Sequence, residues 1–289
     1  MNIFLDKFFS RTNNLGYISE GFKNLLNHTP VEKIFNSINE FSLNSEIRYV
    51  GGCVRKIIKQ ENVDDIDLAT NLNPQQVCEA LKKNNIGFYE TGIAHGTITA
   101  VIDNHTFEIT SLREDVGTDG RHADVKFTTD WKKDALRRDF SINAIYSDAE
   151  GNLFDPFNGK EDLENGLVKF IGNPDQRIKE DYLRILRYVR FHLNYSNFNH
   201  NSQTIKIIKK NLGGISILSK NRLLDELKKF IKSNLLSKLS KDKLSVELFN
   251  IIFPQIKKIK IFSMPNTFAK ERLKEANFIF LLSLLIIDG

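Results

Sequence analysis

The chain has 289 residues, of which 41% are hydrophobic and 27% are charged, a balance that excludes disordered and fibrous proteins. Only two cysteines occur, Cys53 and Cys78, which excludes a disulfide-rich secreted scaffold and a zinc site built from Cys-x-x-Cys pairs. Residues 1–200 hold 24 basic and 29 acidic side chains, whereas residues 201–289 hold 17 basic and 7 acidic ones. This asymmetry favours an acidic, metal-binding front joined to a basic part that holds a polyanion, although solvated lysine-rich helices would give the same charge.

The sequence carries no recognisable targeting segment. The first residues, MNIFLDKFFSRTNN, place an acidic residue inside a short apolar run, unlike a secretory signal. The longest apolar stretch, Phe278–Ile287, has about ten residues, where a membrane span needs roughly 20. We therefore expect a soluble, cytoplasmic protein without a membrane partner. Because the chain ends inside this apolar helical pattern, we also expect that the natural protein continues beyond Gly289.

The first 150 residues alternate strand and helix patterns. Helices are predicted after Gly51-Gly52 as far as Ile58 and from Pro74 to about Lys83, because proline suits a first helical turn. β-Branched or alternating runs predict about four or five strands. The candidate runs are Ile47–Val50, Asp65–Ala69, Gly96–Ile102, Thr106–Leu112 and Ile142–Ser147. Asp103-Asn104, between two of these strands, is typical of a hairpin turn.

From Asp175 onward, apolar residues recur at spacings near 3.6, as in helices. Further helices are predicted at about 203–212, 218–234, 240–252 and 267–287. The fold class is therefore α+β, a small mixed sheet followed by an all-helical part.

Three acidic residues in the first part form a candidate metal site. Asp65 and Asp67 lie two apart on a predicted strand, so their side chains share one face. Adjacent carboxylates repel unless a cation lies between them, and Mg²⁺ is the usual partner of such oxygen ligands. Glu108, on another strand, would complete a carboxylate cluster for two metals. Solvated acids at an exposed strand end are the structural alternative.

Two segments have the chemistry to bind a triphosphate. Gly51 and Gly52 allow close approach of a phosphate to a helix start, and Arg55 adds a guanidinium. Arg137 and Arg138 can clamp phosphates while Asp139 or Asn143 bonds a ribose hydroxyl. For the two glycines the alternative is a tight turn, and for the two arginines it is ion pairing with nearby acids.

A third segment has donors and acceptors for a base edge. Asp181, Arg184 and Arg187 are predicted on one helix face, where the alternative is intrahelical ion pairing. The six histidines show no pair at a metal-ligand spacing.

The order of these motifs resembles a known family. GGCVR, DDIDLAT, TGIAHGTITAVID, FEITSLR, RRDFSINA, FDPFNGKEDL and EDYLRILRYVRF follow one another as in the class II tRNA nucleotidyltransferases, the CCA-adding enzymes grouped with bacterial poly(A) polymerases in the polymerase β superfamily. The resemblance covers about residues 30–230. It implies template-independent addition of CCA to the tRNA 3′ end from CTP and ATP, with release of pyrophosphate. It also implies an N-terminal segment (1–30), a nucleotidyltransferase head (31–150), a neck (151–235) and a partial, tRNA-binding body (236–289).

The resemblance assigns roles to individual residues. Asp65 and Asp67 would bind two Mg²⁺ ions, with Glu108 as a third catalytic acid. Asp181 and Arg184 would pair with the incoming base, supported by Arg187 and Arg190. The remaining nucleotide-binding residues would be Gly51, Gly52, Arg55, Arg137, Arg138, Asp139 and Asn143. Ser219-Lys220-Asn221-Arg222 with Glu226 resembles the family's last helical motif. No obligate protein partner is expected.

The sequence departs from the family pattern at Lys56, where an aspartate usually follows GGxVR. The segment Arg113–Lys133 is a candidate mobile loop for switching between CTP and ATP. Two alternatives stay open at this stage: a poly(A) polymerase or A-adding enzyme on the same scaffold, and a catalytically silent RNA-binding protein.

Overall fold

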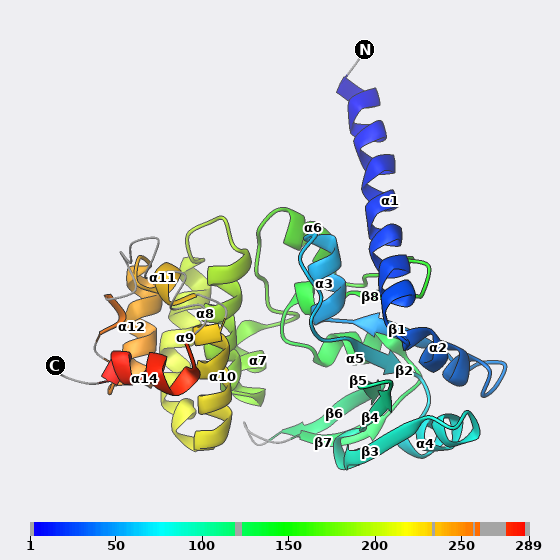
Figure 1. Ribbon diagram of the computed structural model, residues 1–289. Helices are drawn as coiled ribbons and strands as arrows, with labels where there is room; N and C mark the ends of the chain where they lie inside the picture. Colours follow the sequence, from blue (N-terminus) through cyan, green and yellow to red (C-terminus); the bar gives the residue numbers. More distant parts are fainter. Residues whose placement is uncertain (1–2, 119–122, 233–234, 257, 261–275, 287–289) are drawn as a thin grey trace. The chain divides into compact units, whose positions relative to one another are not determined.

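The computed structural model describes every residue except 1–2, 119–122, 233–234, 257, 261–275 and 287–289. The chain divides into two compact units. The head unit comprises Met1–Gly117, Asp124–Asn165 and Lys169–Ile171, and the helical unit comprises Thr118–Ala123, Gly166–Val168 and Gly172–Gly289. The head unit contains a mixed sheet, and helices dominate the other unit, so the predicted α+β class is confirmed (Figure 1). The boundaries of the four predicted domains stay predictions.

Seven strands form the main sheet, in the order β3-β4-β5-β2-β1-β8-β9. The sheet is mixed because β2 and β5 run parallel, whereas the other neighbouring strands run antiparallel. The strands are β1 (Ile47–Val50), β2 (Asp67–Thr70), β3 (Gly87–Gly92), β4 (Thr97–Ile102), β5 (His105–Ser111), β8 (Tyr146–Ser147) and β9 (Leu153–Phe154). Seven strands exceed the four or five that the sequence predicts, because β3 and β9 lack clear alternation.

Several predicted elements are confirmed where local chemistry is strong. The helix α4 (Pro74–Lys83) starts with a capping box, in which the side chains of Asn73 and Gln76 bond each other's backbone N–H groups. Asp103 and Asn104 both have positive φ, 48° and 66°, as expected for a two-residue hairpin turn between β4 and β5.

Two predicted strands are wrong in part. β2 begins at Asp67, so Asp65 lies in the preceding connection. The expected strand Ile142–Ser147 instead begins as a short 3₁₀ helix, η2 (Ser141–Asn143), and only Tyr146–Ser147 is strand. Local backbone bonds close this turn, since Asn143 N donates to Phe140 O at 2.9 Å and Ala144 N donates to Ser141 O at 3.0 Å. The Ser141 hydroxyl also donates to Asp162 at 2.6 Å.

The segment Arg113–Lys133, expected to be a loop, contains two paired strands. These are β6 (Arg113–Thr118) and β7 (Ala123–Phe127), and the residues between them lie outside the described part. The helix α5 (Trp131–Arg137) follows, capped by the Asp130 carboxylate, which accepts from Lys132 N at 2.8 Å.

The head core has aromatic side chains on both faces of the sheet. On one face, the Tyr49 ring lies 4.9 Å from the Phe22 ring of α1 (Ile3–His28) and 4.8 Å from the Phe35 ring of α2 (Val31–Asn39). On the other face, Trp131 of α5 and Tyr146 of β8 pack edge to face, 5.4 Å apart. α5 is therefore held firmly against the sheet.

The helical unit consists largely of short helices (Figure 1). They are α7 (Pro174–Glu180), α8 (Leu183–Tyr195), α9 (Ser202–Asn211), α10 (Lys220–Lys232), α11 (Leu235–Leu239), α12 (Lys243–Ile252) and α14 (Phe278–Ile286). The predicted helix 267–287 is described only from Phe278 to Ile286. Within the described residues, no helix is both long enough and apolar enough to span a membrane.

Candidate active site

Of the three predicted catalytic acids, Asp67 and Glu108 lie on neighbouring strands of the head sheet, and Asp65 lies two residues before Asp67. In the parallel register of β2 and β5, Asp67 is directly opposite Glu108. Burial raises the pKa of Asp67, the Glu108 and Asp65 charges raise it further, and Arg138 and Arg55 oppose them. Because a carboxylate under net repulsion is stabilised by a divalent cation, this donor set fits Mg²⁺.

The Gly51-Gly52 turn lies directly beside these acids. Gly51 has a φ of 66°, a conformation that L side chains rarely adopt. A Cβ added to Gly52 would lie 3.7 Å from Asp67 Oδ2, and one added to Gly51 would lie 3.6 Å from Arg138 Nη1. The turn therefore leaves the space between a carboxylate and a guanidinium open.

Buried polar bonds join Arg55 of α3 (Gly52–Ile58) to Asn143 and Asp139. Arg55 Nη1 donates to Asn143 Oδ1, and Asn143 Nδ2 donates to Asp139 Oδ1 at 2.8 Å. Asp139 Oδ1 also accepts from Phe140 N at 2.9 Å. All three side chains are less than a tenth exposed. The structure thus brings together three residues that are up to 88 positions apart.

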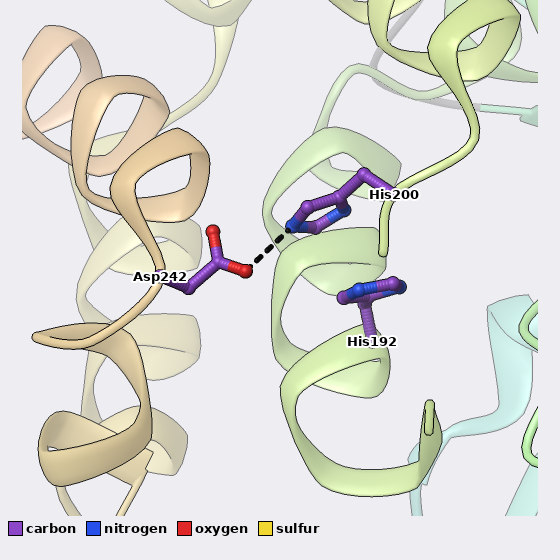
Figure 2. A group of neighbouring side chains, drawn as sticks. All are labelled: His192, His200 and Asp242. Carbon is purple, nitrogen blue, oxygen red and sulfur yellow. Dashed lines mark ion pairs between the residues drawn. The ribbon is translucent and has the colours of Figure 1, made fainter. Parts of the chain in front are cut away.

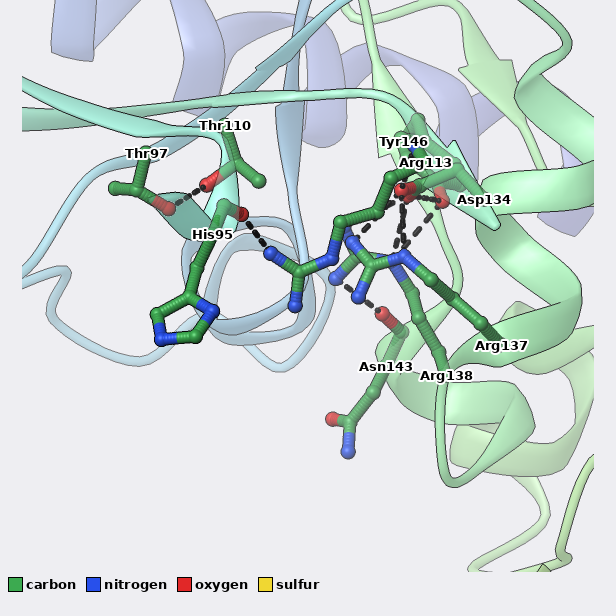
Figure 3. A network of polar contacts seen from close by, with 9 residues as sticks. All are labelled: His95, Thr97, Thr110, Arg113, Asp134, Arg137, Arg138, Asn143 and Tyr146. Atoms are coloured by element: carbon green, nitrogen blue, oxygen red, sulfur yellow. Dashed lines mark hydrogen bonds and ion pairs between the residues drawn. The ribbon is translucent and has the colours of Figure 1, made fainter. Parts of the chain in front are cut away.

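A residue that the sequence analysis did not single out, Asp134, organises the arginine pair (Figure 3). Its carboxylate is fully buried and lies 2.7 Å from Arg137 Nη2 and 3.1 Å from Arg138 Nη2. Tyr146 OH donates to it at 2.7 Å. Although burial raises the pKa of Asp134, the Arg138 and Arg137 charges hold it well below its ordinary value. The helical spacing of Asp134 to Arg137 and Arg138, i to i+3 and i+4, is the signal that could have identified it.

Arg113 of β6 extends this network toward the strand β4. Its backbone N donates to Asp134 Oδ1 at 3.2 Å, and its Nη1 donates to the carbonyl oxygen of His95 (Figure 3). Burial, together with the Arg137 charge, lowers the pKa of Arg113 to about 10. Two arginine side chains and the backbone N–H of a third arginine therefore bond one buried carboxylate.

In the helical unit, the predicted helix face of Asp181, Arg184 and Arg187 is wrong. Asp181 ends α7 in an extended conformation, with φ −155° and ψ 106°, and α8 starts only at Leu183. Asp181 Oδ1 accepts from Leu183 N, the first backbone N–H of α8, at 3.1 Å, so the residue precedes the helix rather than belonging to it. Arg184, 8% exposed, turns back to α7, where Nη1 donates to Arg177 O and Glu180 Oε2, each at 2.8 Å.

The motif Ser219-Lys220-Asn221-Arg222 contacts these residues through α10. Arg222 Nη2 donates to Asp181 Oδ2 at 2.8 Å, across 41 positions of sequence. In the same helix, the buried Glu226 accepts from Arg190 Nε. Arg190 also lies over the Phe191 ring, 4.4 Å from its centroid, and Arg187 lies 5.4 Å from it. Asp181 and Arg190, two of the four residues predicted to contact or support the base, are therefore held by α10.

Lys56, the residue at which the sequence departs from the family pattern, forms a local ion pair. Lys56 Nζ lies 2.7 Å from Asp64 Oδ2, where the Asp64 side chain is 74% exposed. Lys56 therefore pairs with the acid that precedes Asp65.

A glycine beside Asp181 yields a stability prediction. A Cβ at Gly214 of η3 (Leu212–Ile217) would lie 2.0 Å from the Tyr182 ring, whereas a Cβ at Gly213 would meet nothing within 4 Å. We expect Gly214→Ala to lower the free energy of unfolding by about 1–3 kcal/mol, because overpacking must displace Tyr182. The control Gly213→Ala is expected to change it by less than about 1 kcal/mol. Equal urea midpoints for the two variants would contradict the prediction.

Comparison with known proteins agrees with this geometry. Residues 47–169 match the family model of the poly A polymerase head domain. The "CCA tRNA nucleotidyltransferase 1, mitochondrial" of Homo sapiens is 47% identical over 194 residues, which cover 66% of this chain and 45% of that protein. The "CCA-adding enzyme" of Lactobacillus helveticus is 38% identical over 186 residues, covering 64% of this chain and 45% of that protein. The chain thus spans about half the length of these relatives.

A solved structure has the same fold. The Bacillus stearothermophilus CCA-adding enzyme in complex with CTP superposes with a TM-score of 0.64 at 23% identity, over 88% of this chain and 68% of that one. The resemblance expected from the motif order is confirmed.

Proposed function

Because residues 47–169 belong to the poly A polymerase head-domain family, we propose that this chain adds CCA to the 3′ end of tRNA from CTP and ATP, with release of pyrophosphate. The observation that carries the proposal is the pairing of Asp67 with Glu108 beside the Gly51-Gly52 turn and two arginines. Carboxylates for metal ions beside cations for phosphates are what nucleotidyl transfer requires.

Two Mg²⁺ ions bound by Asp65 and Asp67 would activate the attacking 3′-hydroxyl and neutralise charge on the leaving pyrophosphate. Glu108 adds a third carboxylate to that site. Arg55 and Arg138 offset the triphosphate charge, with Gly51 and Gly52 admitting the phosphates closely. Arg137 supports this group through the Asp134 carboxylate that it shares with Arg138.

The other proposed contacts belong to the ribose, the base and the tRNA. Asp139 and Asn143 bond the ribose. The Asp139 carboxylate and the Asn143 amide already lie together, because Asn143 Nδ2 donates to Asp139 Oδ1. Asp181 and Arg184 read the base edge, with Arg187 and Arg190 in support. The tRNA phosphates bind exposed lysines of the helical unit, which include Lys206, Lys209, Lys210, Lys220, Lys229, Lys238, Lys241 and Lys243. A cytoplasmic location and the lack of an obligate protein partner stay predictions.

The test is incorporation of labelled CTP, ATP, GTP and UTP onto tRNA lacking its terminal CCA, in the presence of Mg²⁺. Addition of two C and then one A is the expected result. Addition of A alone would favour the second candidate, a poly(A) polymerase or A-adding enzyme, which the description of the matching head-domain family supports. No addition, with tRNA still bound, would favour a silent RNA-binding protein.

The base-reading role makes a prediction for Arg184. Arg184→Ala is expected to reduce the preference for C and A over G and U by about tenfold or more, because each lost polar contact is worth about 1–3 kcal/mol. Triphosphate affinity should change less. Lys209→Ala is the control, since Lys209 pairs with Glu247 at an exposed site of the same unit, and it should leave base choice unchanged. An unaltered preference in Arg184→Ala would refute the role.

A further inference from the structure

Two histidines and an aspartate meet inside the helical unit, although no spacing in the sequence indicates it. His192 belongs to α8, His200 lies in the connection between α8 and α9, and Asp242 precedes α12 as its N-cap. One ligand atom from each residue lies within 4.8 Å of the other two. Figure 2 shows the Asp242 carboxylate directed at the His200 ring, with the His192 ring beside that of His200.

The polar bonds around this cluster orient its ligand atoms. His200 Nε2 lies 3.3 Å from Asp242 Oδ2, and His200 Nδ1 lies 3.3 Å from the Tyr188 hydroxyl. Asp242 Oδ1 accepts from Ser245 N at 2.7 Å, which leaves Oδ2 directed at the histidines. Metal-binding histidines usually bond through their second ring nitrogen in this way.

The surroundings favour ligands over solvated side chains. His192 is 7% exposed, and the His200 side chain is 5% exposed. Burial, together with the neighbouring His200, lowers the pKa of His192 to about 4. Both rings therefore lie where an unprotonated imidazole is the stable form at neutral pH.

We propose that His192, His200 and Asp242 form a binding site for one Zn²⁺ ion, which links α8 to α12. Two imidazole nitrogens and one carboxylate oxygen are a common zinc donor set, and they leave a fourth position for water or the Ser245 hydroxyl. This hydroxyl lies 3.2 Å from His200 Nε2. Mg²⁺ prefers oxygen ligands alone, so the site would differ in metal from the carboxylates of the head unit.

Binding requires one local rearrangement. The two imidazole rings are stacked, with centroids 3.6 Å apart and an interplanar angle of 19°. Because each nitrogen lone pair lies in its own ring plane, one ring must turn about its Cβ–Cγ bond to reach a shared ion. Zn–N distances of about 2.0–2.1 Å then draw the three ligand atoms closer together.

The experiment titrates the metal-free full chain with Zn²⁺ against a chromophoric chelator, with excess Mg²⁺ present to occupy the head carboxylates. We expect one equivalent to bind and the thermal midpoint to rise, because a ligand that binds the folded state stabilises it. His200→Gln should weaken Zn²⁺ affinity by more than about 100-fold. His28→Gln, which changes an exposed histidine at the end of α1, is the control and should bind as the wild type does.

A second variant keeps the test decisive if His200→Gln fails to fold. Asp242→Asn preserves the cap on Ser245 through its amide oxygen and removes the anionic ligand. Co²⁺ is the probe for this variant, since its visible spectrum reports a site with nitrogen ligands and low coordination number. We expect this spectrum in the wild type and its loss in Asp242→Asn. Failure of the wild type to bind one equivalent, or an unchanged spectrum in the variant, would overturn the proposal.

Discussion

Asp67→Asn is expected to reduce nucleotide incorporation by at least about 10³-fold, which corresponds to roughly 4 kcal/mol of lost transition-state stabilisation. The reason is that asparagine keeps the shape of Asp67 and removes one anionic ligand from the proposed Mg²⁺ site. Incorporation of labelled CTP onto tRNA lacking CCA is the measurement. Asp64→Asn is the matched control, because Asp64 is an exposed acid of the same segment and pairs with Lys56.

The same variant should leave the metal-free protein at least as stable as the wild type. Burial, Glu108 and Asp65 raise the pKa of Asp67, so its ionised form is less favourable in the folded state than in the unfolded state. The wild type therefore loses stability as the pH rises from the ordinary aspartate pKa of about 3.9 through the raised value. Asparagine does not ionise, so Asp67→Asn does not lose stability over this pH range.

Thermal unfolding with and without Mg²⁺ separates a metal role from a folding defect. Mg²⁺ should raise the midpoint of the wild type and of Asp64→Asn more than that of Asp67→Asn. If Asp67→Asn unfolds at a much lower temperature in the absence of metal, or if its incorporation rate is unchanged, the metal role is refuted.

Asp134→Asn is expected to lower the free energy of unfolding by about 3–5 kcal/mol at neutral pH. Removing one partner from a buried ion pair leaves charge without compensation, and Asp134 is fully buried against Arg137 and Arg138. Urea unfolding measures the effect. Asp225→Asn is the control, since Asp225 pairs with Lys228 at an exposed site, where such pairs contribute about 1 kcal/mol or less.

The pH dependence gives a second readout for Asp134. Its folded pKa lies below the ordinary value, so its contribution is present above about pH 3.9 and is lost as the pH falls toward the folded pKa. The difference between wild type and Asp134→Asn should therefore shrink below about pH 3.9. Because Arg138 loses the carboxylate that orients it, the variant should also bind CTP more weakly. A variant as stable as Asp225→Asn would contradict the prediction.

The sequence by itself determined the elements whose signals are local. The capping box at Asn73 and Gln76 and the Asp103-Asn104 turn depend on residues two or three positions apart, so propensity and capping specify them. The order of the motifs indicated the resemblance to the CCA-adding enzymes in the same way, because it needs no knowledge of which side chains touch. The α+β class follows from the change to a helical period at Asp175. This change does not depend on the exact bounds of any single strand.

Only the tertiary structure decided which side chains meet. The pairing of Asp67 with Glu108 depends on the parallel register of two strands 41 positions apart, and Arg222 reaches Asp181 through the packing of α10. The break between α7 and α8 was missed because helical periodicity runs through Asp181, whereas its backbone is extended and its side chain accepts a bond from Leu183 N. His192 and His200 are eight positions apart with Asp242 far beyond them. Their meeting results from burial of apolar helix faces, a non-directional force that leaves no spacing pattern in the chain.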